Sequence, residues 1–255
     1  MVVAIVQARM SSTRLPGKVL IDIQGKPLLE HVVDRVSPSK LINQLVIATT
    51  ANEKDKAIID FAQRRGIAYY VGSEDDVLDR FYQTAKIYRV KTIVRITPDN
   101  PFKDPEVIDK VVGYYLNHKK SVDYVSNTIK PTYPEGLDVE VFSFTALEKA
   151  WREAKLPSER EHVTPYIWNH PELFHVANVE NEEDLSHLRW TLDYEEDLRF
   201  AREVYARLYH GQVFLMEDIL ALLRAEPALR MINQGIARYE GYLRSLEQEQ
   251  NLSKS

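Results

Sequence analysis

Short apolar runs rich in β-branched residues recur along the first half of the chain, with helical patterns between them. The runs cover residues 2–6, 44–49, 68–71, 92–96 and 123–125. Between the first two runs, apolar side chains repeat at intervals of three and four, as they do on one face of an amphipathic helix. Strands that alternate with helices form βαβ units around a parallel sheet, so the first half of the chain is predicted to be a doubly wound α/β fold.

Further helices are predicted over residues 76–88 and 105–116, and residues 58–66 indicate a helix that ends in two arginines and Gly66. From about residue 130 the pattern changes. Residues 137–144 alternate polar and apolar side chains, as in an antiparallel or mixed sheet. The segments that follow are predicted to form helices over 143–154 and 161–169 and a strand over 174–179.

After the segment "LRWTLDYEEDLRFAREVYARL", which covers residues 188–208, the chain is predicted to be helical to its end. An apolar stripe at intervals of three and four is expected to pack on the same chain or on a second subunit, and consists of Ile236, Tyr239, Leu243 and Leu246.

Composition excludes several classes of protein. A net charge of −5 and an isoelectric point near 5.9 argue against a general nucleic-acid binder, so any anion site must be local. The sequence has no cysteine, which excludes disulfides and thiolate chemistry. Neither a signal peptide nor an apolar stretch of about 18 residues is found, so we expect no membrane association and a cytoplasmic location.

The stretch "VQARMSSTRLPGKVL" follows the first predicted strand, where open α/β sheets bind their ligands. It has a single glycine and matches neither GxGxxG nor GxxxxGK[ST], so Arg9, Arg14 and Lys18 would supply most of the charge for a phosphate group. A nucleoside triphosphate carries roughly four negative charges, which leaves about one for a metal ion. The alternative is a solvated surface loop.

Two acidic segments are candidates for a metal site. Asp99 follows the predicted strand 92–96 in "VRITPDNPFKDP" and is well placed to hold Mg²⁺, whereas Asp104, before Pro105, fits a helix N-cap. Asp193 in "LRWTLDYEEDL" ends a strand-like run, with Asp197 at a helix start. Asp193 could be a helix cap, or it could share a metal ion with Asp99 if their strands are neighbours.

Other polar residues permit weaker predictions. Asp79 and Arg80 in "GSEDDVLDRF" could form a local ion pair or contact a ligand. Asp138, Glu140 and His162 are polar residues in apolar surroundings and are candidates for the pocket of an acceptor substrate, although a lone histidine is more often structural. No side chain is identified as a general base.

Taken together, the ordered blocks resemble the cytidylyltransferase family that makes CMP-activated sugar acids, including the 3-deoxy-manno-octulosonate and acylneuraminate enzymes. The resemblance covers residues 2 to about 200 and is strongest to the branch of the spore-coat polysaccharide biosynthesis proteins SpsF. Its most specific block is "QARMSSTRLPGKVL". "GSEDDVLDRF", "TPDNPFKDP", "EGLDVEVFS", "EHVTPYI" and "LRWTLDYEEDL" follow in the family's order.

The resemblance implies a nucleotide-diphospho-sugar-transferase-like (GT-A) fold: a mixed α/β sheet flanked by helices. Residues 1–215 would form the nucleotidyltransferase domain and residues 216–255 a helical extension. CTP is the implied donor and Mg²⁺ the metal ion. The implied triphosphate site is Ala8, Arg9, Ser12, Arg14 and Lys18, with Asp79 and Arg80 near the nucleotide or sugar; the implied metal ligands are Asp99 and Asp193.

The implied reaction transfers CMP to an acceptor and releases pyrophosphate, with Arg9, Arg14 and Lys18 stabilising the leaving group. This chain has "TPDNP" where the sugar-acid enzymes often have "QGDxP", so the cytosine contacts cannot be carried over. Its "EGLDVEVF" and "EHVTPYI" blocks belong to the SpsF-like branch, whose acceptor is poorly defined, so the acceptor cannot be carried over either. Because a fold supports several activities, a GT-A glycosyltransferase and a non-catalytic nucleotide-binding protein are alternatives. Relatives are commonly dimers, so we expect a homodimer.

Overall fold

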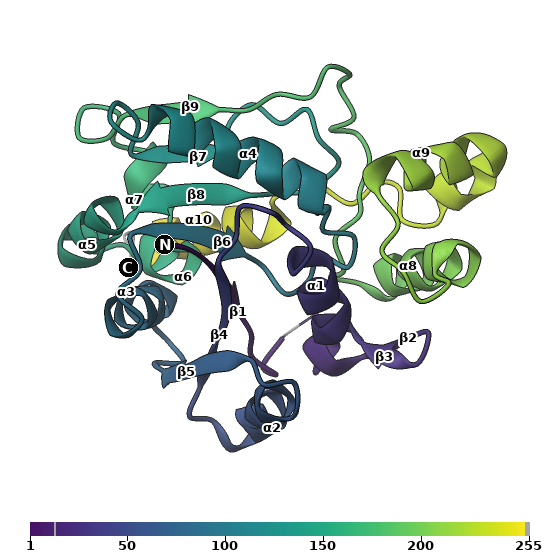
Figure 1. Cartoon of the computed structure of the whole chain (residues 1–255), viewed down its shortest axis with the longest axis horizontal. Helices are drawn as coiled ribbons and strands as arrows, with labels where there is room; N and C mark the ends of the chain where they lie inside the picture. The colour runs from purple at the N-terminus through teal and green to yellow at the C-terminus, as the bar shows by residue number, and fades with distance from the viewer. Residues whose placement is uncertain (13, 253–255) are drawn as a thin grey trace.

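In the computed structural model, which describes residues 1–12 and 14–252, a seven-stranded sheet runs through the molecule in the order β5-β4-β1-β6-β8-β7-β9 (Figure 1). Its strands are β1 (Val2–Gln7), β4 (Gln44–Thr50), β5 (Ala68–Gly72), β6 (Thr92–Ile96), β7 (Tyr124–Ser126), β8 (Glu140–Ser143) and β9 (Val176–Asn178). A separate hairpin joins β2 (Asp22–Ile23) to β3 (Lys26–Pro27).

The first half of the sheet is parallel, which confirms the doubly wound prediction. β1 pairs in parallel with both β4 and β6, and β4 pairs in parallel with β5. The connections are α1 (Leu28–Val36), α2 (Lys56–Arg64) and α3 (Val77–Ile87), with short 3₁₀ turns η1 (Lys18–Leu20) and η2 (Glu53–Asp55). All carboxyl ends of these strands therefore lie at one edge of the sheet.

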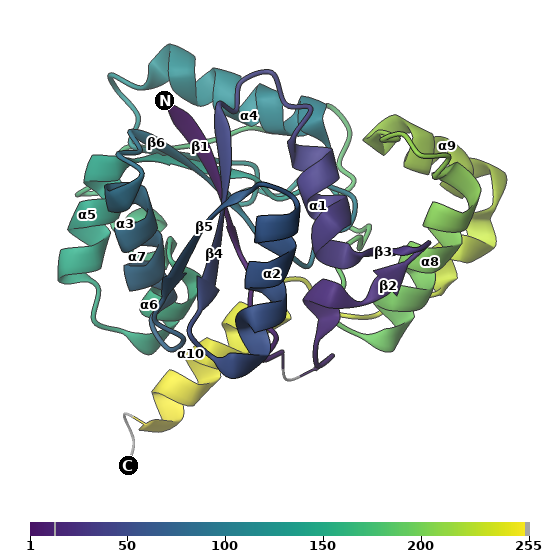
Figure 2. The ribbon, with the colours of Figure 1, turned by 60° about the horizontal axis from the view of Figure 1, so that its bottom comes forward.

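Alternate residues of β1 reach two separate cores, one on each face of the sheet. Val2, Ala4 and Val6 pack with α1, α2 and α4 (Pro105–His118), whereas Val3 and Ile5 pack with α3, α5 (Phe144–Glu153) and α7 (Pro165–Trp168). These two groups of helices lie on opposite sides of the sheet (Figure 2). Such complete burial explains why the strands are nearly continuous apolar runs.

The second half of the sheet is mixed, as the alternating pattern predicts. β8 is antiparallel to both β6 and β7, and β7 is parallel to β9. Arg95 on β6 is the register partner of Glu140 on β8. The antiparallel strand thus places polar side chains beside the end of β6.

Local signals for the helix ends are confirmed. The Asp104 carboxylate accepts hydrogen bonds from the backbone of Glu106 and Val107 at the start of α4, and Gly66 has a φ of 63° after α2. The predicted helix over 161–169 is wrong. The chain forms α6 (Pro157–His162) and α7 instead, because Val163 has a φ of 74° and Pro165 starts a new helix.

The C-terminal part contains α8 (Glu195–Leu208), α9 (Met216–Ala225), the 3₁₀ turn η3 (Pro227–Met231) and α10 (Glu240–Leu252). The helical character predicted for this part is confirmed, but it is divided among separate elements, and residues 232–239 are not helical. The predicted stripe does not lie on one helix, since Ile236 and Tyr239 precede α10, and packing of this region on a second subunit stays a prediction.

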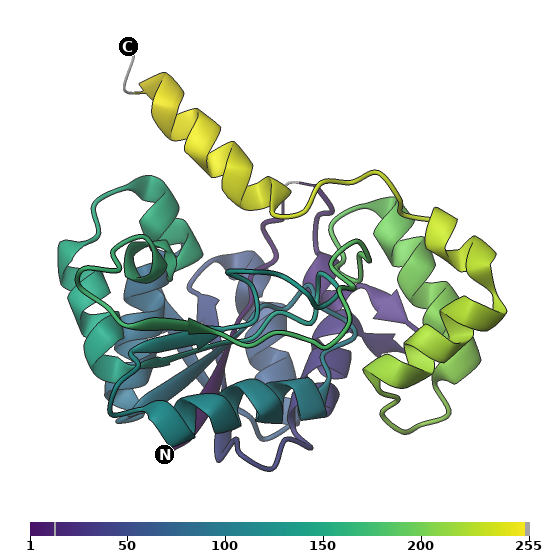
Figure 3. The same ribbon diagram turned by 90° about the horizontal axis from the view of Figure 1, so that it is seen from above.

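α10 packs on α6 of the same chain through polar contacts and extends beyond the rest of the molecule (Figure 3). Ser245 bonds to His162 at 3.0 Å, and the Glu249 carboxylate accepts a hydrogen bond from the Ser158 amide. The division at residue 215 and the homodimer stay predictions. No helix in residues 1–12 and 14–252 is long and apolar enough to cross a membrane.

Candidate active site

A cavity of about 540 Å³ opens at the carboxyl ends of β1 and β6. The loop after β1, residues 97–100 after β6, and residues of α6 and α10 line it. Ala8, Arg9, Ser12, Arg14 and Lys18 all line it. The residues that the sequence suggested for the phosphate loop therefore line a single cavity.

Lys18 lies at the centre of a cluster of oxygen atoms. Its Nζ is 2.9 Å from Asp99 Oδ2, 2.8 Å from Asp193 Oδ1 and 3.1 Å from the carbonyl oxygen of Leu192. Gly17, with a φ of 72°, turns the chain immediately before Lys18. These three oxygens, which we call the oxygen cradle, use all three donor hydrogens of the ammonium group.

The oxygen cradle is a cation site by its chemistry. Burial lowers the pKa of Lys18, but Asp99 and Asp193 raise it by more, so the pKa lies above its ordinary value. The ammonium thus stands where another cation could bind. Mg²⁺ commonly uses one or two carboxylates together with phosphates and waters, and within the described residues no larger group of His, Cys, Asp or Glu side chains could hold a metal.

Asp99 and Asp193 both contact Lys18, but Asp193 does not follow a strand, although the sequence had predicted one. Residues 188–193 form no strand, apart from a single bridge at Arg189, although the Leu192 amide donates to the carbonyl oxygen of Asp99 at 2.8 Å. Asp193 does not cap α8 with its side chain. That role falls to Asp197, whose carboxylate accepts from the amides of Asp193 and Tyr194.

Asp193 is the most strongly held carboxylate of the cavity. Besides Lys18, its Oδ1 accepts from Arg14 Nη2 at 2.5 Å, and its Oδ2 lies 3.5 Å from Arg189 Nη2. Burial raises its pKa, but Lys18 and Arg14 lower it by more, to about 2. Asp193 is therefore ionised at every physiological pH.

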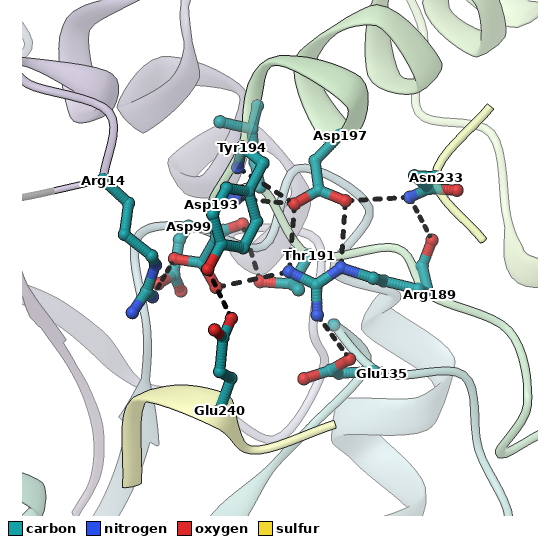
Figure 4. A network of polar contacts seen from close by, with 12 residues as sticks. Arg14, Asp99, Glu135, Arg189, Thr191, Asp193, Tyr194, Asp197, Asn233 and Glu240 are labelled. Atoms are coloured by element: carbon teal, nitrogen blue, oxygen red, sulfur yellow. Dashed lines mark hydrogen bonds and ion pairs between the residues drawn. The ribbon is translucent and has the colours of Figure 1, made fainter. Parts of the chain in front are cut away.

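Sequence reasoning missed a buried ionic network behind Asp193 (Figure 4). Arg189 forms two hydrogen bonds with Asp197, both at 3.0 Å, and one with Glu135 Oε2 at 2.8 Å; Asn233 also donates to Asp197. Glu135 lines the cavity, and burial raises its pKa to about 7. No local pattern connects Glu135 with Arg189, because they lie 54 residues apart.

The guanidinium groups at the cavity are not fully satisfied by the protein. Arg14 Nε and Arg80 Nε are buried without a hydrogen-bond partner. Arg80 is 1% exposed, and burial together with nearby Arg9 lowers its pKa to about 10. Buried unpaired donors are costly, so both atoms fit an anionic ligand. Arg9 is freer, with one 3.4 Å hydrogen bond to the Glu74 carbonyl and Glu161 at 3.9 Å.

Asp79 and Arg80 have different surroundings, and of the two only Arg80 lines the cavity. The Asp79 carboxylate accepts from Trp151 Nε1 at 2.8 Å and from Gln83 Nε2 at 3.0 Å. It joins α3 to α5 and is turned away from the predicted nucleotide contact, because consecutive residues of an α-helix point in directions about 100° apart.

The three residues predicted for the acceptor pocket also differ in their positions. Asp138 and His162 line the cavity, whereas Glu140 does not. Asp138 pairs with Arg238 at 2.9 Å, and burial lowers the pKa of His162 to about 4, so this imidazole is neutral at pH 7. Glu140 lies behind the cavity wall, where it pairs with Arg95, a residue that sequence reasoning also missed.

Comparisons with known proteins give one consistent result. The sequence model of the family described as Cytidylyltransferase matches residues 3–226. An uncharacterized protein of Methanocaldococcus jannaschii is 40% identical over 239 residues, covering 92% of this chain and 95% of that protein. The spore coat polysaccharide biosynthesis protein SpsF of Bacillus subtilis is 34% identical over 230 residues, covering 88% and 94%.

A solved structure resembles this one over nearly its full length. The cytidylyltransferase of Leptospira borgpetersenii serovar Hardjo-bovis superposes with a TM-score of 0.87 at 31% identity. The superposition covers 93% of this chain and 99% of that one. The helical C-terminal region is therefore included in large part.

Proposed function

Because this chain belongs to the cytidylyltransferase family, we propose that it transfers CMP from CTP to a sugar acid or a related acceptor, with release of pyrophosphate. The name of the relative SpsF supports a role in surface polysaccharide biosynthesis. One observation carries the proposal: Arg14, Lys18, Asp99 and Asp193 converge at one cavity from three distant parts of the chain.

In the proposed reaction, an oxygen of the acceptor attacks the α-phosphorus of CTP. The bond between that phosphorus and the oxygen bridging to the β-phosphate breaks, pyrophosphate leaves, and the acceptor proton passes to solvent. Charge builds on the leaving oxygens, so fixed cations nearby lower the barrier. Such a reaction depends on positioning and charge more than on a covalent intermediate.

The chain offers fixed donors for the triphosphate. Arg14 and Arg80 each present a buried Nε without a protein partner, and Arg9 is only weakly held. Charge-assisted hydrogen bonds from guanidinium to phosphate are among the strongest that proteins make. Cations fixed by buried surroundings replace the multiple glycine amides of other phosphate loops.

Mg²⁺ fits the oxygen cradle, because that cradle already surrounds the Lys18 ammonium with three oxygen atoms. Asp99 and Asp193 would hold the metal, and when bound it would neutralise phosphate charge and polarise the α-phosphate. The same oxygens cannot hold two cations. Lys18 would then be free to pair with a phosphate group.

The test is release of pyrophosphate from CTP with a panel of sugar acids, sugar phosphates and neutral sugars, each in the presence of Mg²⁺. Asp99→Asn and Asp193→Asn should lose at least 100-fold in rate while keeping their circular dichroism spectra. Asp34→Asn is the matched control, since Asp34 pairs with Lys26 and Arg65 outside the cavity.

Pyrophosphate release that depends on a sugar acid would support the proposal. Transfer of sugar from a preformed nucleotide-sugar, without pyrophosphate release from CTP, would favour a glycosyltransferase. Tight CTP binding with no turnover on any acceptor would favour a non-catalytic protein. Near-normal rates in both aspartate variants would contradict the metal site.

A further inference from the structure

One row of polar side chains crosses three neighbouring strands below the cavity. Gln7 ends β1, Arg95 lies on β6, and Glu140 begins β8, where it is the register partner of Arg95. Arg95 Nε donates to Gln7 Oε1 at 3.2 Å, and Arg95 Nη1 pairs with Glu140 Oε2. The guanidinium plane of Arg95 is thus fixed from two directions.

Glu140 is itself held in place by two further donors. The Tyr124 hydroxyl donates to Glu140 Oε1 at 2.7 Å, and the Thr164 hydroxyl donates to the same atom at 2.6 Å. Burial raises the pKa of Glu140, but Arg95 and the hydroxyl donors lower it by more, so the carboxylate stays ionised. The break between α6 and α7 places Thr164 for this contact. Glu140 is thus a positioning residue for Arg95.

Arg95 keeps donor capacity on the cavity side. It lines the cavity with a side chain that is 12% exposed, and among the described residues Nη2 has no hydrogen-bond partner. A guanidinium with two donors clamped and one end open suits a planar group with two acceptor oxygens.

The other cations of the cavity lie elsewhere. The cations that line it are Arg9, Arg14, Lys18, Arg80, Arg95 and Arg244. Arg80 lies beside Arg9, near the phosphate loop. Arg244 is half-exposed on α10 and paired with Glu240. Among the described cations that line the cavity, only Arg95 lies on the β8 side, near enough to His162 for its charge to lower the pKa of that imidazole.

We infer that Arg95, oriented by Gln7 and Glu140, binds the carboxylate of the acceptor and so selects acidic sugars over neutral ones. The inference rests on the proposed function and deepens it. Two carboxylates that line this side of the cavity already have cationic partners, since Glu135 pairs with Arg189 and Asp138 pairs with Arg238. Arg95 lines the same side and keeps an open donor among the described residues, so an acceptor carboxylate that binds there meets a cation.

The experiment compares 3-deoxy-manno-octulosonate and N-acetylneuraminate with their methyl esters, which lack the charge. Pyrophosphate release gives KM and kcat for each, and calorimetry gives the affinity for CTP alone. The double variant Arg95→Met, Glu140→Gln removes both charges together and so leaves no unpaired buried ion. Arg95→Lys keeps the charge and loses the flat, clamped geometry. Arg65→Met, whose partners Glu30 and Asp34 lie outside the cavity, is the control.

We expect the wild type to prefer each active acid over its ester by at least tenfold in kcat/KM, and the double variant to lose that preference. Affinity for CTP should change less than twofold in every variant. A variant whose structure is merely damaged would have lower rates with both the acid and the ester, and its acid-to-ester ratio of kcat/KM would not change.

Two results would overturn the inference while the proposed function stands: an unchanged acid-to-ester ratio in the double variant, or a tenfold loss of CTP affinity, which would place Arg95 at the nucleotide. If the wild type releases pyrophosphate with neutral sugars and with neither acid, then both the inferred carboxylate contact and the proposed acceptor class are wrong.

Discussion

Replacing Lys18 by methionine removes the ammonium from the oxygen cradle and keeps most of the side-chain volume. Asp99 Oδ2 and Asp193 Oδ1 are both bonded to the same nitrogen, so these oxygens lie less than about 6 Å apart. At an effective dielectric constant of about 20, two such charges repel by about 3 kcal/mol. Arg14 and Arg189 still partner Asp193, so we expect Lys18→Met to lower the free energy of unfolding by about 2 kcal/mol without metal.

The informative measurement is urea unfolding with and without 10 mM Mg²⁺, in the absence of nucleotide. In the wild type the ammonium already fills the oxygen cradle, so Mg²⁺ should change the free energy of unfolding by less than about 0.5 kcal/mol. In Lys18→Met the cradle is open, and Mg²⁺ that binds only the folded state should recover about 1–2 kcal/mol. Lys130→Met, which breaks the exposed pair with Glu180, is the control and should show neither effect.

Equal stabilisation of wild type and Lys18→Met by Mg²⁺ would refute the reasoning, because it would show that the ammonium and the metal do not compete. Loss of the effect in Lys18→Met, Asp99→Asn would assign the recovered stability to the oxygen cradle. If the recovery persists in that double variant, the metal binds elsewhere.

Arg14→Ala should weaken CTP binding in the presence of Mg²⁺ roughly 10- to 100-fold through loss of charge-assisted hydrogen bonds, and calorimetry with CTP and Mg²⁺ but no acceptor would measure it; unchanged affinity would limit Arg14 to supporting Asp193. The pKa of Asp193, lowered to about 2, predicts stability that is fully present above its unfolded value near 4 and is lost as pH falls toward 2. Between those pH values the metal-free protein should lose about 2 kcal/mol through Asp193, and the unfolding curve of Asp193→Asn should be flatter over that range.

The parts of the fold that were predictable are those set by nearest neighbours in sequence. β-Branched runs predict the strands, and Asp104 before Pro105 predicts the start of α4, since a cap needs only the residues that follow it. The helix break at Val163 was missed because a positive φ at a β-branched residue goes against local preference. The residue after it, Thr164, makes a contact that is distant in sequence, a hydrogen bond to Glu140.

The sequence could predict that the phosphate loop and Asp99 belong to the candidate site, because ligands bind at the carboxyl ends of parallel strands. The roles of the predicted acceptor residues were harder to predict from the sequence. Polarity in an apolar segment singled out Glu140, but not Arg95, on which Glu140 acts. That Arg95 and Glu140 lie side by side depends on the register of β6 and β8, and register is a property of the folded sheet.

The charges of the cluster also constrain how the nucleotide binds. Arg14 and Lys18 are balanced by Asp99 and Asp193 before any ligand arrives. A triphosphate with roughly four negative charges would therefore meet two carboxylates as well as two cations, and would gain little net attraction from the cluster. A divalent cation that takes the carboxylates releases both side-chain cations toward the phosphates. Affinity for CTP should consequently rise with Mg²⁺ in the wild type, whereas in Asp99→Asn, Asp193→Asn, where the cations are already free, the metal should add little.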